Sequence, residues 1–298
     1  MSTPKADYPF VSVVIPTYRH WQDLPTCLRS LETQTYPRDL YEVIIVNNDP
    51  GKECPYPLPA DNMSLLVEPR EGSYAARNRG IVNAKGEILA FTDADCVPAP
   101  DWIEQAVKLF QGNKGLDRLA GNIKLVFDVM SSPAALHQKV FAFNQRDNAQ
   151  KGTSVTANLW AHRRVFKEIG HFDGELKSNA DLQWGLKAQK AGFTITFAPS
   201  VIVSHPALTD IDSLLRKARR VYGGHYARMK WHTRPFPIQL VLSLYPFRPP
   251  LLEIYKALFA RGLTFRQKVL VLWVLIRIRR TQWREHIDLS KGKSPERV

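Results

Sequence analysis

The residues best suited to chemistry are two aspartates, Asp93 and Asp95, which follow a short apolar run over residues 87–91. That run predicts a buried strand. Because alternate residues of an extended chain point to the same side, both carboxylates are expected to face one place at the C-terminal end of this strand. Open α/β sheets bind their ligands there. Neighbouring carboxylates repel each other unless a cation lies between them, and Mg²⁺ or Mn²⁺ binds carboxylate and phosphate oxygens together.

An acidic turn or a helix cap explains the same pair of aspartates without any ligand, because Asp is common in both. The pattern Asp-x-Asp alone does not separate a metal site from these structural roles. Its meaning therefore depends on the elements that surround it and on the other polar side chains that they bring nearby.

Strands and helices alternate along the first 110 residues of the chain. The apolar patterns predict strands over residues 11–15, 41–46, 64–67 and 87–91, and helices over residues 21–33, 72–83 and 100–110. This alternation predicts an α/β fold with a mostly parallel sheet and helices on both faces. Polar loops follow the first strands, which is the geometry of a nucleotide site. The chain lacks the Gly-x-Gly-x-x-Gly and Gly-x-x-x-x-Gly-Lys-Ser/Thr patterns, so neither a dinucleotide site nor a P-loop is expected.

The pattern after residue 112 is less regular. It predicts strands over residues 119–126, 153–160, 193–197 and 201–204, and helices over residues 133–143, 163–169 and 182–191. Two titratable residues lie at the ends of these elements. Asp181 immediately precedes the last helix, and His205 follows the last strand.

Basic residues are concentrated at the end of the chain. Residues 211–298 hold 19 Lys and Arg against 5 Asp and Glu, a net charge of +14, whereas residues 1–210 have a net charge of −1. This asymmetry predicts a near-neutral domain over residues 1–210 and a basic region over residues 211–298 with an acidic partner.

The cysteines and the N-terminal residues indicate the compartment. The three cysteines, Cys27, Cys54 and Cys96, form no Cys-x-x-Cys pattern, which favours a reducing compartment without disulfides. The first residues lack the apolar core of a signal peptide, and no stretch reaches the roughly 18 apolar residues of a membrane-spanning helix. We therefore expect a cytoplasmic location.

Six segments of the chain, taken in order, resemble the family 2 glycosyltransferases, which are inverting enzymes of the GT-A fold. They are Val-Ser-Val-Val-Ile-Pro-Thr-Tyr at 11–18, Glu-Val-Ile-Ile-Val-Asn-Asn at 42–48, Ser-Tyr-Ala-Ala-Arg-Asn-Arg-Gly-Ile at 73–81, Phe-Thr-Asp-Ala-Asp at 91–95, the helix that begins near Asp181, and Val-Ser-His-Pro at 203–206. The resemblance implies a Rossmann-like GT-A domain that uses Mn²⁺ or Mg²⁺. It also implies transfer from a nucleotide-sugar donor, with UDP favoured, to a glycan or lipid-linked acceptor in cell-surface polysaccharide synthesis.

The resemblance assigns a donor site residue by residue. It places Pro16, Thr17, Tyr18, Asn47, Asn48, Arg77 and Asp93 around the nucleotide, and Asp95 and His205 around the metal. Asn47 departs from the family, which usually has an aspartate that reads the base, although an amide still offers a donor and an acceptor to a pyrimidine. Arg77 would meet the diphosphate, and a solvent-exposed helix arginine explains its position equally well.

The resemblance also assigns Asp181 as the general base that takes the proton of the acceptor hydroxyl, as an inverting transfer requires. A helix N-terminal carboxylate is the structural alternative, and both roles are compatible. Many relatives have Glu-Asp here, whereas this chain has Ala180 before Asp181. Trp184, one turn later, is expected to stack against an acceptor sugar, and core packing is the alternative.

The basic region contains two stretches with helical periodicity. Residues 211–222 and 265–283 place apolar side chains on one face and arginines or lysines on another. Residues 236–252 are apolar but contain four prolines, which prevents one straight helix. Basic amphipathic helices of this composition favour an anionic membrane surface, so we expect a protein bound to the cytoplasmic face. Packing on the first domain is the alternative, and no nucleic-acid partner is expected, because that domain shows no clustered basic and aromatic residues.

Two other functions remain open from the sequence. A sugar-phosphate nucleotidyltransferase can share the layered α/β core, but it would carry a glycine-rich loop after the first strand, where this chain has Pro16-Thr17-Tyr18. A degenerate transferase that serves as a membrane or polyanion-binding scaffold would have lost its site carboxylates. Asp93, Asp95 and Asp181 are all present, which favours an enzyme.

Overall fold

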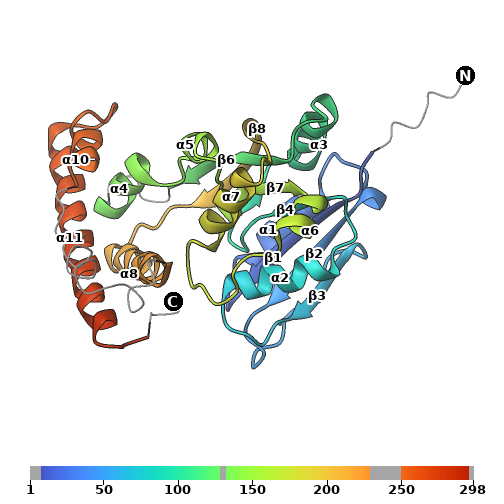
Figure 1. Ribbon diagram of the computed structural model, residues 1–298, viewed down its shortest axis with the longest axis horizontal. Helices are drawn as coiled ribbons and strands as arrows, with labels where there is room; N and C mark the ends of the chain where they lie inside the picture. Colours follow the sequence, from blue (N-terminus) through green and yellow to red (C-terminus); the bar gives the residue numbers. More distant parts are fainter. Residues whose placement is uncertain (1–7, 128–131, 229–249, 295–298) are drawn as a thin grey trace, which may run out of the picture. The chain divides into compact units, whose positions relative to one another are not determined.

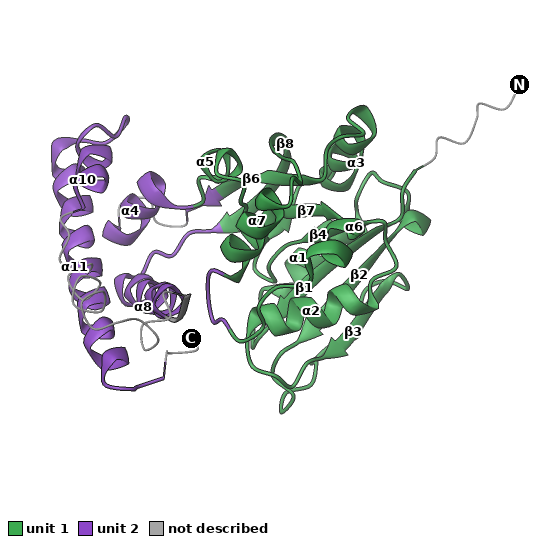
Figure 2. Cartoon of the chain, viewed as in Figure 1, with its two compact units in different colours: residues 1–124, 143–175, 180–205 green, residues 125–142, 176–179, 206–298 purple. Residues whose placement is uncertain are grey.

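The structure is a computed structural model that describes residues 8–127, 132–228 and 250–294 (Figure 1). The chain forms two compact units, coloured separately in Figure 2. Unit 1 comprises residues 1–124, 143–175 and 180–205, and unit 2 comprises residues 125–142, 176–179 and 206–298. Unit 2 thus takes two short segments from the middle of the chain. The division into domains at residue 210, which rests on charge, stays a prediction.

Within the described residues, one eight-stranded sheet has the order β3-β2-β1-β4-β7-β6-β8-β5. The strands are β1 (Val11–Thr17), β2 (Tyr41–Asn47), β3 (Met63–Val67), β4 (Ile88–Phe91), β5 (Val97–Pro98), β6 (Arg118–Val126), β7 (Leu159–His162) and β8 (Ile195–Pro206). The strands β3, β2, β1 and β4 run parallel, as predicted. In contrast, β7 pairs antiparallel with both β4 and β6, and β5 pairs antiparallel with β8. The sheet is therefore mixed. β8 is one continuous strand, not the two short strands predicted over residues 193–204.

Helices cover both faces of the parallel strands, as predicted. The inward residues Val11, Val13 and Ile15 of β1 share an apolar core with α1 (Leu24–Glu32) and α3 (Trp102–Gly112). The opposite face of β1 packs against α2 (Ser73–Asn83). There, a β-carbon on Gly80 would lie 2.4 Å from Val14 Cγ1, so only glycine permits the observed approach of helix and strand.

The predicted strand over residues 153–160 is wrong for most of its length. Residues 156–158 form a short 3₁₀ helix, η2, and only the strand β7 that follows joins the sheet. The polar side chains explain this, because they bond locally and compete with strand pairing. Gln145, on a short helix α5 (Gln145–Gln150) that the sequence pattern did not predict, donates through Nε2 to Ser154 Oγ at 2.9 Å and to the Asn158 carbonyl at 3.1 Å.

The fully buried Asn158 connects four elements around the central core. Its Oδ1 accepts hydrogen bonds from Trp102 Nε1 at 3.0 Å and Trp160 Nε1 at 3.1 Å. Its Nδ2 donates to the carbonyls of Asn122 and Val201, both at 2.9 Å. One amide therefore satisfies both indoles and ties β6, β7, β8 and α3 together.

The remaining helices of unit 1 are α6 (Arg163–Ile169) and α7 (Ala180–Lys190), together with the 3₁₀ turn η1 (Arg38–Leu40). Unit 2 consists mainly of α4 (Pro133–Phe141), α8 (Ile211–Arg228), α10 (Leu251–Leu258) and α11 (Phe265–Ser290). Both helices predicted in the basic region are present, as α8 and α11. Most of the proline-containing stretch over residues 236–252 lies outside the described residues. Of the helices in the described ranges, none combines the length and apolar character needed to cross a membrane.

We predict that Asn158→Leu lowers the free energy of unfolding by about 3 kcal/mol or more. The substitution keeps the number and branching of the side-chain heavy atoms, but it leaves two buried indole N–H groups and two carbonyls without their partner. Urea unfolding followed by tryptophan fluorescence measures the change. The control Asn83→Leu, at the exposed end of α2, is expected to stay within about 0.5 kcal/mol of wild type. Equal destabilisation by both substitutions would contradict the role of Asn158.

Candidate active site

The two aspartates of the Asp-x-Asp pattern lie in a tight turn after β4. β4 ends at Phe91, and Cys96 N–H donates to the Asp93 carbonyl at 3.1 Å, before β5 begins at Val97. The expected extended backbone at these residues is therefore wrong. The carboxylates approach each other because the chain reverses direction, not because of strand pleating. Their location at the C-terminal end of a parallel strand agrees with the prediction.

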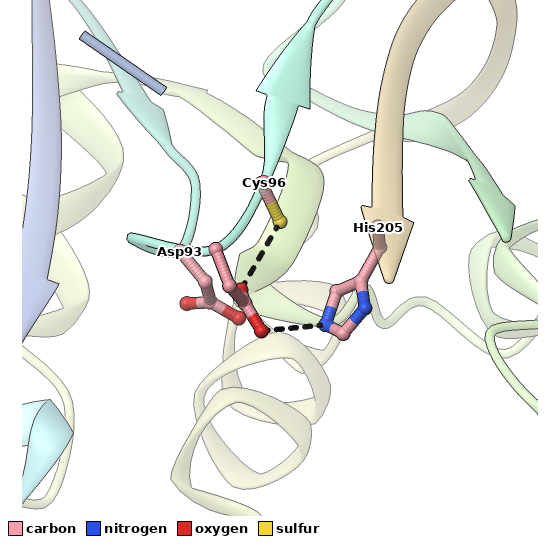
Figure 3. A group of neighbouring side chains, drawn as sticks. Asp93, Cys96 and His205 are labelled. Atoms are coloured by element: carbon pink, nitrogen blue, oxygen red, sulfur yellow. Dashed lines mark hydrogen bonds and ion pairs between the residues drawn. The ribbon is translucent and has the colours of Figure 1, made fainter. Parts of the chain in front are cut away.

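Four side chains with metal-binding atoms converge at this turn (Figure 3). One ligand atom from each of Asp93, Asp95, Cys96 and His205 lies within 4.8 Å of the others. His205 Nε2 is 3.9 Å from Asp95 Oδ2, and it arrives on β8, the strand that pairs with β5. The structure thus brings together Asp95 and His205, which were predicted at the metal, and Asp93, which was predicted at the nucleotide, and their roles stay predictions. Cys96 was not predicted, although its position directly after Asp95 was a signal.

The donor set fits a divalent cation. Burial raises the pKa of the Asp95 carboxyl above its ordinary value, His205 opposes this rise, and the like charge of Asp93 adds to it. A bound cation would relieve that repulsion. Two carboxylates and an imidazole suit Mn²⁺, and carboxylates with water or phosphate suit Mg²⁺. Burial also raises the pKa of the Cys96 thiol well above its usual value, so at neutral pH it is a protonated donor 3.8 Å from Asp95 Oδ1.

Arg77 from α2 is paired with Asp93 at the edge of this cluster. Its side chain is only 5% exposed, so a solvent-exposed helix arginine does not describe it. Its Nε is buried and has no hydrogen-bond partner among the described residues. The guanidinium also lies over the ring of Tyr74, 5.4 Å from its centroid. A fixed positive charge therefore adjoins the carboxylates, and positive charge there suits an anionic ligand.

Asp181 lies in the first turn of α7, and its carboxylate is held by three donors. Tyr74 Oη and the Leu182 backbone N–H donate to Oδ1, both at 2.9 Å, and the Thr156 backbone N–H donates to Oδ2 at 3.2 Å. Burial and the nearby Asp181 carboxylate raise the pKa of Tyr74 well above its usual value, so the hydroxyl stays protonated and keeps donating. Tyr74 was missed from the sequence, although it lies three residues before Arg77 on the same helix.

The predicted base-reading residues lie at the C-terminal ends of β1 and β2, which pair through Thr17 and Asn47. Asn47 Nδ2 donates to the carbonyls of Asp49 at 3.1 Å and Lys52 at 2.7 Å. Asn48 donates to the carbonyls of Glu68 and Arg70 and accepts from the Gly72 N–H. Both amides thus shape the loops after β2 and β3. Direct base recognition by Asn47 and Asn48, and the pocket formed with Pro16, Thr17 and Tyr18, stay predictions.

Trp184 is buried at 3% exposure in an aromatic cluster. Its ring stacks on Phe166 at a centroid distance of 4.3 Å, and its Nε1 donates to the Gly170 carbonyl at 2.9 Å. Core packing, the alternative weighed from the sequence, accounts for all of these contacts. The acceptor-binding role of Trp184 stays a prediction.

Comparisons with known proteins give a consistent result. The model of the family described as "Glycosyl transferase family 2" matches residues 12–170. Glycosyltransferase AglE of Haloferax volcanii is 36% identical over 223 residues, which cover 72% of this chain and 73% of that protein. A dolichyl N-acetyl-alpha-D-glucosaminyl phosphate 3-beta-D-2,3-diacetamido-2,3-dideoxy-beta-D-glucuronosyltransferase of Methanococcus voltae is 21% identical over 225 residues and covers 70% of each chain.

Two solved structures show the same fold. Mannosyltransferase PcManGT from Pyrobaculum calidifontis, in complex with GDP-Man and Mn²⁺, has a TM-score of 0.63 at 18% identity and covers 97% of this chain and 89% of its own. S. aureus TarS 1–349 in complex with UDP-GlcNAc has a TM-score of 0.53 at 16% identity. The match covers 95% of this chain and 92% of the TarS chain. The fold is therefore of the GT-A type, as predicted.

We predict that Asp95→Ala weakens Mn²⁺ binding at least about tenfold, because even the loss of residues that only orient metal ligands costs about 10–100-fold. Isothermal titration of the metal-free protein with Mn²⁺ measures the affinity. The control Asp61→Ala removes an aspartate whose side chain is 90% exposed, and it is expected to bind Mn²⁺ like wild type. An unchanged affinity in Asp95→Ala would remove this residue from the metal site.

Proposed function

The chain belongs to the family 2 glycosyltransferases, and from this premise we propose that it is a metal-dependent inverting enzyme. It transfers a sugar from a nucleoside diphosphate donor to a hydroxyl group of a glycan or lipid-linked acceptor. The observation that carries this proposal is the cluster of Asp93, Asp95 and His205 beside the buried Arg77. Carboxylates that would bind a divalent cation thus lie next to a guanidinium that suits a phosphate.

The donor is proposed to bind across the ends of β1, β2 and β4. Asp95 and His205 would hold the divalent cation, with Asp93 at the metal or the ribose, and the bound cation would supply positive charge for the departing diphosphate. Arg77 is positioned to bind the same diphosphate. The two structural neighbours were solved with GDP-Man and UDP-GlcNAc, and these ligands support a nucleoside diphosphate sugar as the donor. We favour UDP, as the sequence predicted.

Asp181 is the proposed general base. The acceptor oxygen attacks the anomeric carbon, its proton passes to the Asp181 carboxylate, and the bond between the anomeric carbon and the diphosphate oxygen breaks with its electron pair on the diphosphate. A carboxylate offers about four acceptor positions. Tyr74 and Leu182 take two on Oδ1, and Thr156 takes one on Oδ2. Oδ2 therefore retains capacity for the acceptor hydroxyl, while its neighbours fix the orientation of the group.

The two rival functions are less well supported. Family membership argues against a sugar-phosphate nucleotidyltransferase. A degenerate scaffold would have no reason to keep a partly buried, mutually repelling pair of carboxylates in one turn, because such a pair costs stability without a ligand.

We also propose that residues 211–298 hold the enzyme on an anionic membrane, at the cytoplasmic face. The net charge of +14 in this region supports that location. The relative from Methanococcus voltae acts, by its name, on a dolichyl phosphate-linked sugar, which supports a lipid-linked acceptor and a role in cell-surface polysaccharide synthesis.

We predict that one of UDP, GDP, CDP and dTDP raises the melting temperature of the protein when Mn²⁺ is present, and raises it less or not at all without Mn²⁺. A nucleotide that binds only the native state stabilises it by mass action. A thermal-shift screen of the four nucleotides with and without Mn²⁺ measures this and identifies the donor class. Stabilisation that is equal with and without the metal would contradict the metal-dependent site.

We predict that Asp181→Asn lowers kcat by about 10²–10⁴-fold, the usual contribution of a general base, and leaves donor affinity near wild type. An amide of the same shape keeps an acceptor oxygen for Tyr74 but does not take up the proton. Turnover and donor binding are measured separately. The control Asp173→Asn makes the same chemical change at an exposed residue and is expected to retain activity. Near-normal turnover in Asp181→Asn would show that another group is the base.

A further inference from the structure

Large apolar side chains are exposed along α10 and α11 of unit 2. The most exposed are Phe265 at 80%, Leu251 at 70%, Phe259 at 68%, Leu252 at 64%, Ile276 at 60% and Tyr255 at 59%. Val269, Trp273 and Trp283 on α11 are also exposed, at 48%, 41% and 39%. Single exposed apolar residues are ordinary on a protein surface, but so many large ones on two neighbouring helices are typical of an interaction site. We call this group the α10–α11 apolar face.

The periodicity of α11 shows that this face is a second apolar stripe, separate from the one that packs inside unit 2. Val271, Val274 and Leu275 are buried and contact α4, α8 and α10. Phe265, Val269, Ile276 and Trp283 recur at intervals of four or seven residues, which places them together on the outward side. The internal packing of unit 2 therefore leaves these large side chains in solvent.

Basic residues border the apolar face. Arg261, Arg266, Arg280 and Arg284 are exposed on the same two helices and the turn that joins them. No acidic residue occurs from Ile254 to Arg284. The two acidic residues that flank this stretch are both paired, Glu253 with Arg279 at 3.1 Å and the buried Glu285 with Arg219 at 3.5 Å. The uncompensated charge around the apolar face is thus entirely positive.

We propose that the α10–α11 apolar face inserts into the headgroup region of an anionic lipid bilayer, with the arginines around it contacting lipid phosphates. This proposal rests on the proposed membrane association of residues 211–298 and specifies which surface makes it. The combination of Phe, Leu and Trp with a basic rim is that of an interfacial helix. Trp273 and Trp283 suit the boundary between headgroups and acyl chains, because the indole is apolar with one polar tip.

A second copy of this chain is a less suitable occupant for the same face. Symmetric pairing of two such faces would bring two arginine rims together, and like charges across an interface oppose association. An anionic bilayer offers an apolar interior to the aromatic side chains, and its lipid phosphates offer negative charge to the arginines that border the face. Neither helix is apolar and long enough to span that bilayer, so the contact is interfacial.

The test is flotation of the full chain with vesicles of phosphatidylcholine, with and without phosphatidylglycerol, at low and high salt. Wild type is expected to float with the anionic vesicles and less at high salt. Phe259→Ser combined with Phe265→Ser is expected to weaken binding by about tenfold or more for each ring. Arg266→Gln combined with Arg280→Gln is expected to weaken it by about fivefold for each charge. The control Val82→Ser changes an apolar residue of unit 1 that is 65% exposed and is expected to bind like wild type.

These outcomes distinguish insertion of the α10–α11 apolar face from membrane association of residues 211–298 in general. Normal flotation of the phenylalanine variant together with loss in the arginine variant would leave a charge-driven association and overturn insertion of the apolar face. Failure of wild type to float with any vesicle would overturn both proposals. A wild-type dimer that the phenylalanine variant converts to monomer, in sedimentation velocity without lipid, would show that a second copy covers the face. Thermal unfolding confirms that each variant folds, and nucleotide stabilisation in the same samples tests the transferase proposal separately.

Discussion

The repulsion between the carboxylates of Asp93 and Asp95 is the constraint around which unit 1 is built. A turn after β4 holds both groups in a partly buried site, where burial raises the pKa of Asp95. Such a pair is unfavourable without compensating positive charge. The chain supplies the positive charge of Arg77 from α2, and it places the imidazole of His205 from β8, far away in sequence, 3.9 Å from Asp95. The order of the strands therefore has a direct chemical consequence, because it decides which side chains meet at the turn.

This arrangement depends on a rigid framework of buried polar groups. Arg118, fully buried in β6, donates to the carbonyls of Gly152 at 2.9 Å, Gly185 at 3.1 Å and Phe193 at 2.9 Å. Burial lowers the pKa of Arg118 to about 10, which still leaves it charged at neutral pH. Together with Asn158, it joins β6, β8 and the loop before η2 through hydrogen bonds that only one geometry satisfies. Thr156, whose N–H holds the Asp181 carboxylate, belongs to η2, so this framework also orients the proposed base.

The sequence predicted the features that depend on local pattern. The parallel strands, the helices between them, and the meeting of Asp93, Asp95 and His205 followed from apolar runs and family motifs. The turn at Asp93 is closed by the Cys96 N–H three residues away, and an acidic turn was the structural alternative that the sequence offered. The 3₁₀ helix before β7 depends on partners farther away along the chain, Gln145 and the carbonyls of Asn122 and Val201, which no local pattern reveals. Likewise, the Asn48 amide is satisfied by carbonyls about twenty residues away, and Trp184 is enclosed by rings from other segments, so neither contact was predictable from position alone.

Unit 2 poses a different energetic problem from unit 1. A helix that is apolar on one side is stabilised by packing that side, and a helix that is apolar on two sides needs a second apolar environment. α11 packs Val271, Val274 and Leu275 internally and still exposes Phe265 and Ile276. In water that outward stripe favours self-association, and the arginines beside it oppose association by like-charge repulsion. The same arginines would be attracted by a negatively charged surface. The charge pattern of this helix therefore disfavours contact between copies and favours contact with anionic lipid, which is the distinction that the proposed membrane contact requires.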